Sequence, residues 1–302
     1  MNEMLTTADG RSVLRIERRL AHPTAKVWRA VTDPAHLARW FPAPVAFDGD
    51  LAVGVKVGFD MGDGLAWDGV VTHCDPPRTV AFTWGDDHLR LDLSPVGPSC
   101  RLVLVHTFDD RAGAASFAAG WDRCLDALGR GLDGRPAEIE PPSAELHERF
   151  VRQFDLTAAT VVDGPSGWAV RTERQLTRPA ATAWAVLTGA AGDAAGPTAA
   201  DAREAALAAG DPVPPRAVAA GLRPGRVSAV EAPILLAYQW CEGDREAGDV
   251  RWELGHEGTG HGARLVVVQT GPPELAGARA AALAAWPAAV DALAADLLAS
   301  RP

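Results

Sequence analysis

The sequence predicts an α+β protein made of two copies of one domain, each an antiparallel sheet wrapped on a long C-terminal helix. The main observation is an internal repeat, because residues 15–32 (RIERRLAHPTAKVWRAVT) return at 171–188 (RTERQLTRPAATAWAVLT) with eight of eighteen positions identical. Near the end of each copy, WDRCLDAL at 121–128 matches WPAAVDAL at 286–293. A repeat of this length corresponds to a whole domain, since solenoid units repeat every ~20–50 residues.

The first copy is expected to begin with a strand and two short helices. Residues 12–20 alternate apolar and charged side chains, which is typical of a strand with one buried face. Pro23 then suits a first helical turn, and TAKVWRAVT predicts a short helix with Val27 and Trp28 facing inward. Pro34 opens a second short helix over AHLARWF.

Five further strands and one long helix complete the first copy. Apolar runs separated by turn residues predict an antiparallel meander with strands at 53–60, 65–74, 78–84, 88–93 and 101–108. The longest helix is predicted at 113–132, and its apolar stripe has helical spacing. A helix across a curved sheet encloses a concave apolar space, where small ligands bind.

The second copy keeps this framework but has diverged. Residues 189–226 lose the aromatic side chains of the first copy, which predicts a loop with one Ala-rich helix near 198–209 and short or absent early strands. The offset between the copies grows from 156 to 163, which predicts a polar hairpin extension around CEGDREAGD. Arg18 and Arg174 are repeated charges, expected in exposed ion pairs that contribute under ~1 kcal/mol.

The expected division is a domain at 1–135, a linker at 136–168 and a second, diverged domain at 169–302. A chain of 302 residues is near the size at which single cores split. Ser143 can cap a linker helix running to about Asp155, and its apolar face is expected to pack on one or both domains. This predicts intramolecular pairing of the two domains.

Composition excludes several classes of function. Net charge is −10 with no basic stripe, which argues against a nucleic-acid partner. The N-terminus has neither a basic nor an apolar region, so no secretory signal is expected. The most apolar stretch, 278–299, contains Asp291, Asp296 and Pro287 and is not expected to span a membrane. The four cysteines lack CxxC spacing, which predicts buried free thiols and a cytoplasmic location.

A set of motifs over 12–132 is specific enough to indicate a family. The opening RIERRLAHPTAKVWRAVTDPAHLARWF is followed by WDGV at 67–70, DPPR at 75–78 and FTW at 82–84. This part of the chain resembles the START-like SRPBCC superfamily, in the branch named after the heat-shock-protein ATPase activator homologue (its C-terminal-domain type). The resemblance implies a helix-grip fold that encloses an apolar cavity, and the internal repeat extends this fold to a second tandem domain. No cofactor is expected. It does not imply one activity, because the superfamily includes lipid carriers, polyketide cyclases and hormone receptors.

Three histidines are candidates for a chemical role. His106 lies on a strand face expected to point into the cavity, where it could anchor a ligand or transfer a proton; a buried, hydrogen-bonded histidine is the favoured interpretation. The matching residue in the second copy is Gln269. His256 and His261 lack a third ligand nearby in sequence, so no metal site is predicted.

Aromatic residues supply the predicted ligand site. Trp40, Phe41 and Trp67 have no aromatic counterpart in the second copy, so the duplicated framework does not require them. The residues predicted to bind a ligand are Trp40, Phe41, Phe59, Trp67, Trp84, His106, Phe117 and Trp121.

The favoured function is non-catalytic binding of a hydrophobic or aromatic small molecule in the first domain, with the second domain a degenerate structural partner. No motif of a nucleotide site, hydrolase or metalloprotease is present, so no catalytic residue is predicted. One alternative is an enzyme of the polyketide cyclase or aromatase kind that uses His106 or Asp68. Another is a chaperone-associated protein-interaction module, which would expose an apolar patch.

Overall fold

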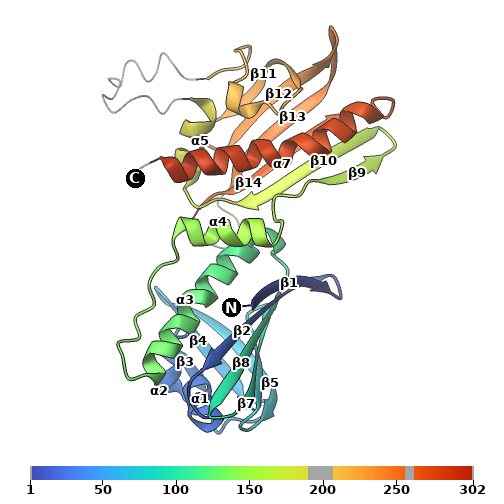
Figure 1. Cartoon of the computed structure of the whole chain (residues 1–302). Coiled ribbons are helices and arrows are strands. Elements are labelled where there is room, and N and C mark those ends of the chain that lie inside the picture. Colours follow the sequence, from blue (N-terminus) through green and yellow to red (C-terminus); the bar gives the residue numbers. More distant parts are fainter. Residues whose placement is uncertain (1, 190–206, 256–261, 301–302) are drawn as a thin grey trace, which may run out of the picture. The chain divides into compact units, whose positions relative to one another are not determined.

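The computed structural model describes residues 2–189, 207–255 and 262–300, and the chain divides into two compact units, Met1–Phe150 and Val151–Pro302 (Figure 1). The division falls inside helix α4 (Ala144–Gln153), where Ser143 Oγ accepts the expected capping hydrogen bond from Leu146 N at 3.2 Å. His256 and His261 lie outside the described residues, as does most of the helix expected near 198–209. Pairing of the two domains stays a prediction.

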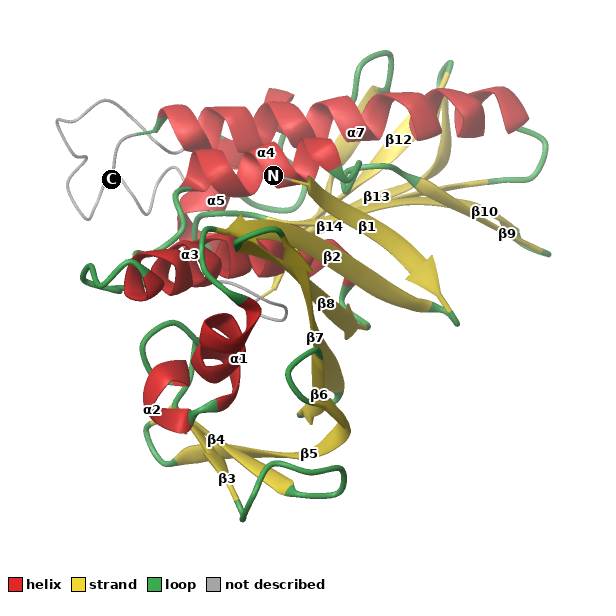
Figure 2. Cartoon of the chain, turned by 60° about the horizontal axis from the view of Figure 1, so that its bottom comes forward, coloured by secondary structure: helices red, strands yellow, loops and turns green. Residues whose placement is uncertain are grey.

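The first unit is one antiparallel sheet with three helices. Its strands are ordered β1-β2-β8-β7-β6-β5-β4-β3. They span β1 (Asn2–Ala8), β2 (Arg11–Leu20), β3 (Val45–Phe47), β4 (Lys56–Gly62), β5 (Leu65–Asp75), β6 (Thr79–Trp84), β7 (Asp87–Val96) and β8 (Ser99–Phe108). The helices are α1 (Thr24–Thr32), α2 (Pro34–Leu37) and α3 (Ala114–Leu132), with a 3₁₀ turn, η1 (Arg111–Gly113), before α3. Figure 2 shows the sheet curling until β3 and β4 come round to α2, and α2 packs on β3.

The second unit repeats this plan without two strands. Its elements are β9 (Thr160–Gly164), β10 (Gly167–Gln175), α5 (Ala180–Thr188), η2 (Pro215–Ala217), β11 (Arg223–Glu231), β12 (Leu235–Glu242), β13 (Arg245–Gly255), β14 (Arg264–Gly271) and α7 (Ala276–Ala299). The order β9-β10-β14-β13-β12-β11 reproduces β1-β2-β8-β7-β6-β5. Residues 207–222 hold no counterpart of β3 or β4. The predicted fold class and tandem duplication are confirmed.

Two edge strands were not predicted. Strand β1 joins β2 through Asp9 and Gly10, whose φ values of 49° and 81° suit the Asp-Gly turn of a two-residue hairpin. Strand β9 pairs with β10 as a hairpin with a two-residue turn, inside the stretch expected to be a linker. Both are edge strands with few large apolar side chains, so the period-two signal of a half-buried strand is weak in them.

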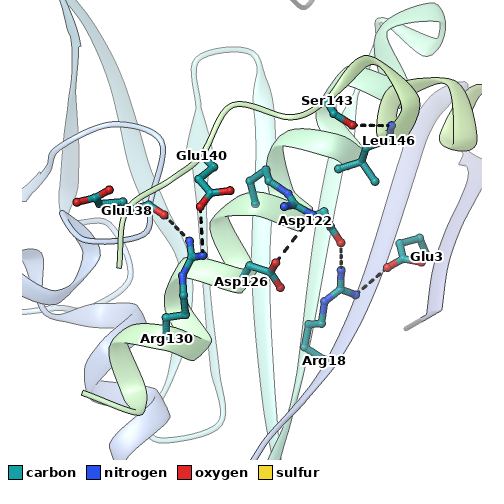
Figure 3. Close-up of polar contacts among 10 residues, drawn as sticks. Glu3, Arg18, Asp122, Asp126, Arg130, Glu138, Glu140, Ser143 and Leu146 are labelled. Carbon is teal, nitrogen blue, oxygen red and sulfur yellow. Dashed lines mark hydrogen bonds and ion pairs between the residues drawn. The ribbon is translucent and has the colours of Figure 1, made fainter. Parts of the chain in front are cut away.

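The ion pair of Arg18 corrects an expectation. Its guanidinium lies 2.7 Å from Asp122 of α3 and 2.8 Å from Glu3 of β1, as Figure 3 shows. All three side chains are at most 10% exposed, so the pair is buried and not exposed as expected. The unpredicted strand β1 accounts for the difference, because it covers this end of β2 and adds the second carboxylate. In the second unit Arg174 pairs with Asp291 of α7 at 2.9 Å.

Candidate ligand-binding site

The eight residues predicted to bind a ligand lie in one group, which we call the aromatic cluster together with Phe82 and Phe108. The cluster is formed by side chains of β4, β5, β6 and β8, the turn after α2, and α3. Phe41 is at its centre, with its ring centroid 5.8 Å from that of Trp40, 6.0 Å from Phe59, and 5.6 Å from both Trp84 and Trp121. The rings contact one another directly, so side chains fill this space.

Trp67 forms the exposed edge of the cluster. It stands opposite Phe59 in the β4–β5 register, so both rings share one face of the sheet, and it lies 5.8 Å from Trp84. Its ring also lies over Gly85, where an added Cβ would be 3.5 Å from it. Trp67 is 38% exposed, whereas Trp84 is buried. Solvent therefore reaches the cluster at Trp67. Asp68, next to it on the strand, alternates to the other face.

The indole N–H of Trp84 has no hydrogen-bond partner within the described part of the chain, although the atom is buried. In the second unit the matching Trp240 donates to the backbone oxygen of Thr270 at 2.7 Å. The register explains the difference, because Asp87 stands opposite Trp84 and Gly248 stands opposite Trp240. A Cβ at Gly248 would lie 2.8 Å from Nε1 of Trp240, so glycine is needed for that placement.

His106 is held by hydrogen bonds at both ring nitrogens. Its Nδ1 accepts from Nε1 of Trp121 at 3.2 Å, and its Nε2 lies 2.9 Å from Oδ2 of Asp87. Because tryptophan can only donate, His106 must carry its proton on Nε2 when neutral. Burial lowers the pKa of His106 below its ordinary value, although the hydrogen bond and negative charge of Asp87 oppose the shift. Neither nitrogen is available to a ligand. This matches the favoured interpretation of a buried, bonded histidine.

The second unit contains a cavity of about 350 Å³ at the corresponding place. Trp240 and Gln269 line it, and they match Trp84 and His106. The rest of the wall is Ala219, Ala220, Gly221, Leu222, Arg223, Cys241, Glu242, Gly243, Gly277, Ala278, Ala281, Ala282 and Ala285. That the second domain is a degenerate structural partner stays a prediction. Alanine has little side-chain volume, and space remains open where the first domain has rings.

A smaller cavity of about 170 Å³ lies behind Trp40 in the first unit. Basic side chains of α1 and the α2 region surround it, and its apolar wall comes largely from the last turns of α3. One of these basic groups, Lys26, donates to the backbone oxygen of Leu132 at 2.6 Å and so caps α3. This cavity is separated from the aromatic cluster by Trp40 itself.

The described residues contain no group of three or more His, Cys, Asp or Glu side chains that could hold a metal ion. The four cysteines are free, with Cys100 and Cys124 buried and Cys74 and Cys241 half-buried. Burial raises the pKa of Cys124 to about 12, so that thiol stays protonated. The expectation of four buried thiols is therefore corrected for Cys74 and Cys241.

Helix α7 is long and apolar enough to cross a membrane, with a mean hydropathy of 1.5 over its best window. A helix in the interior of a globular domain can be equally long and apolar. Trp286, Val290 and Leu293 of α7 are buried in the core of the second unit, against β10 and β14. The absence of a membrane span stays a prediction.

One family model matches part of the first domain. Residues 21–133 match the family described as Activator of Hsp90 ATPase homolog 1-like protein. No curated protein matches the chain. Similar solved structures include EF2215 of Enterococcus faecalis, a conserved protein of unknown function, at 20% identity over 50% of this chain and 89% of that one, with a TM-score of 0.44. CalU16 of Micromonospora echinospora is 24% identical over 50% and 96%, with a TM-score of 0.41. DynU16, from the dynemicin biosynthetic locus, is 19% identical over 95% and 97%, with a TM-score of 0.40.

Proposed function

Since residues 21–133 form a domain of the activator-of-Hsp90-ATPase-homologue-1-like family, with a START-like SRPBCC fold, we propose that this chain is a cytoplasmic, non-catalytic binding protein for a hydrophobic or aromatic small molecule. The ligand binds at the aromatic cluster of the first domain. A fold hosts many functions, so the argument depends on the residues of this site.

The indole N–H of Trp84 is the observation that carries the proposal. A buried donor without an acceptor costs ~1–3 kcal/mol, and Nε1 of Trp84 is the one such atom within the aromatic cluster among the described residues. The donor lies among apolar rings whose solvent-exposed edge is Trp67. A ligand with an apolar body and one oxygen acceptor would satisfy Trp84 while replacing contacts between rings. Because the cluster is filled by its own side chains, binding requires Trp67 and its neighbours to move.

The state of His106 supports binding over catalysis. A cyclase-type enzyme needs a general acid or base within reach of the bound carbonyl. Both nitrogens of His106 are bonded within the protein, and Asp68 alternates away from Trp67 on β5. The two residues considered for an enzyme therefore do not converge on one point.

A protein-interaction role is the second candidate. Leu65 and Trp67 of β5 are exposed apolar residues near the β4–β5 turn, and exposed apolar groups of this kind can bind a protein partner. Such a partner would cover Trp67 without reaching the N–H of Trp84. The two roles therefore differ in their dependence on Trp84.

The test is a fluorescence titration of the full chain with a panel of flavonoids, aromatic polyketides and fatty acids. We expect saturable quenching of tryptophan emission by at least one class. Trp84→Phe removes the donor and keeps an aromatic ring, and should weaken binding of the best compound about tenfold, since one hydrogen bond contributes about 1.4 kcal/mol. Trp240→Phe is the matched control in the second domain and should leave that affinity unchanged. Equal affinity in the Trp84→Phe variant and the wild type would exclude this site.

A further inference from the structure

We infer that the second domain has a binding site of its own, for a compact neutral molecule that carries a carbonyl oxygen. The site is the cavity of about 350 Å³ between α7 and strands β11, β12 and β14. Its volume is at the small end of ligand pockets, which run from about 300 to 1,000 Å³. The inference is independent of the proposed function of the first domain.

The cavity exists because small residues replace the rings of the first domain. Ala282 of α7 occupies the position of Phe117 in α3, and Gly271 at the end of β14 occupies that of Phe108. In the first domain these two phenylalanine rings lie 4.5 Å apart and pack on His106. Their absence from the second domain leaves the helix lined with alanine along the cavity.

A buried donor points to the chemistry of the ligand. Gln269 lines the cavity and is 2% exposed. Its Oε1 accepts from Nε1 of Trp286 at 2.7 Å, and because tryptophan can only donate, the amide orientation is determined. Among the described residues, no partner accepts from Nε2 of Gln269. The –NH₂ group is therefore the donor left for a ligand, and a carbonyl oxygen is its natural acceptor.

The remaining wall favours a neutral ligand. Arg223 is the basic residue of the lining, and it is already paired with Asp244 at 3.0 Å and donates to the backbone of Gly243. Trp240 uses its N–H on the backbone of Thr270. Glu242 is the acidic residue of the lining and would repel a carboxylate. The cavity therefore offers a neutral ligand the hydrogen bond of Gln269. It offers an anionic ligand no unpaired positive charge.

The experiment follows the side-chain amide of Gln269 by ¹H–¹⁵N NMR of the full chain, with the resonance assigned by its loss in Gln269→Met. Three probes share one ring: acetophenone has a carbonyl, ethylbenzene lacks it, and benzoate replaces it with a charge. We expect a saturable shift with acetophenone, and affinities at least about tenfold weaker for ethylbenzene, since one hydrogen bond is lost. Benzoate should bind more weakly than acetophenone.

Two variants make the result specific. Ala282→Phe restores the ring of the first domain and should abolish the acetophenone response. Gln269→Met removes the donor and also the acceptor of the Trp286 N–H. The affinity for acetophenone, followed by ligand-observed NMR, should then fall to that for ethylbenzene, which provides a second test if Ala282→Phe does not fold. Trp67→Ala, in the first domain, should leave the Gln269 shift unchanged. A Gln269 resonance that does not respond, or unaltered binding in Ala282→Phe or Gln269→Met, would overturn the inference without affecting the first-domain proposal.

Discussion

Nε2 of His106 lies 2.9 Å from Oδ2 of Asp87, across the neighbouring strands β8 and β7. At the matching positions of the second domain, Gln269 replaces the histidine and Gly248 replaces the aspartate. Both members of the pair therefore differ between the two domains. The histidine and aspartate accompany a filled aromatic cluster, while the glutamine and glycine accompany an open cavity.

His106 should make the stability of the protein depend on pH. Its folded-state pKa is lowered, so below about pH 6.5 the unfolded chain binds a proton that the folded chain resists. The free energy of unfolding should therefore fall as pH decreases from about 7.5 to about 5.5, by at most ~1.4 kcal/mol per pH unit from this group. The other titratable groups acting on it are Asp87, Arg11 and His88.

Urea denaturation at several pH values measures this effect. His106→Gln, which keeps an acceptor for Trp121, should flatten the dependence, and His73→Gln at an exposed position should not. Identical pH profiles in the wild type and His106→Gln would show that His106 does not resist protonation.

Arg18 should be important for stability. Arg18→Met removes the cation that the buried carboxylates of Asp122 and Glu3 share. Because Asp122 keeps its ion pair with Arg123, we expect a cost at or below the ~3–5 kcal/mol of an uncompensated buried charge. Arg15→Met is the matched control, because its pair with Glu17 on the same strand is more exposed and should contribute under ~1 kcal/mol. Chemical denaturation measures the free energy of unfolding of both variants. Equal losses of stability would contradict the prediction that the buried Arg18 pair stabilises the protein more than the exposed Arg15 pair.

Gly248 should not tolerate a side chain. A Cβ there would lie 2.1 Å from the backbone oxygen of Thr270 and 2.8 Å from Nε1 of Trp240. Gly248→Ala should therefore lower the melting temperature and displace the Trp240 indole. Gly58→Ala, in a strand position with nothing within 4 Å, is the control and should change little. Thermal unfolding with the indole N–H spectrum reports both effects; an unshifted Trp240 signal would contradict the steric argument.

Phe117→Ala should open in the first domain the space that Ala282 leaves in the second. Because Phe117 is half-buried, we expect a loss in the free energy of unfolding below the ~3–5 kcal/mol of a fully buried phenylalanine truncated to alanine, together with new binding of a hydrophobic dye such as ANS. Equilibrium unfolding and dye fluorescence at native conditions measure the two effects. A loss of stability without dye binding would show that the cluster collapses around the vacated space.

Much of this architecture could be predicted from the repeat, because Trp84, Trp121 and His106 each have a partner at a regular offset. The strand alternation also predicted that His106 points toward the helix. Its bond to Asp87 depends on the β7–β8 register and on the width of the intervening turn, which local patterns do not define. The edge strands β1 and β9 were missed because they bury little apolar surface.

The cavity of the second domain could not be predicted for a different reason. An alanine-rich helix can approach a sheet closely or leave a space, and the choice depends on the large residues that hold the two apart. Here the buried Trp286 of α7 reaches the sheet and donates to Gln269 of β14. The unpaired N–H of Trp84 likewise follows from Asp87 standing where the second domain has glycine, which becomes visible only when the two sheets are compared.

The ¹H–¹⁵N spectrum of the indole N–H groups, recorded while the full chain is saturated with the tightest-binding compound of the ligand panel, tests the central claim most directly. Binding at the aromatic cluster predicts a downfield shift of the Trp84 indole proton as it gains an acceptor, with the Trp240 indole unchanged. Saturation of the chain without any change at Trp84, or a panel in which no compound binds saturably, would contradict the account.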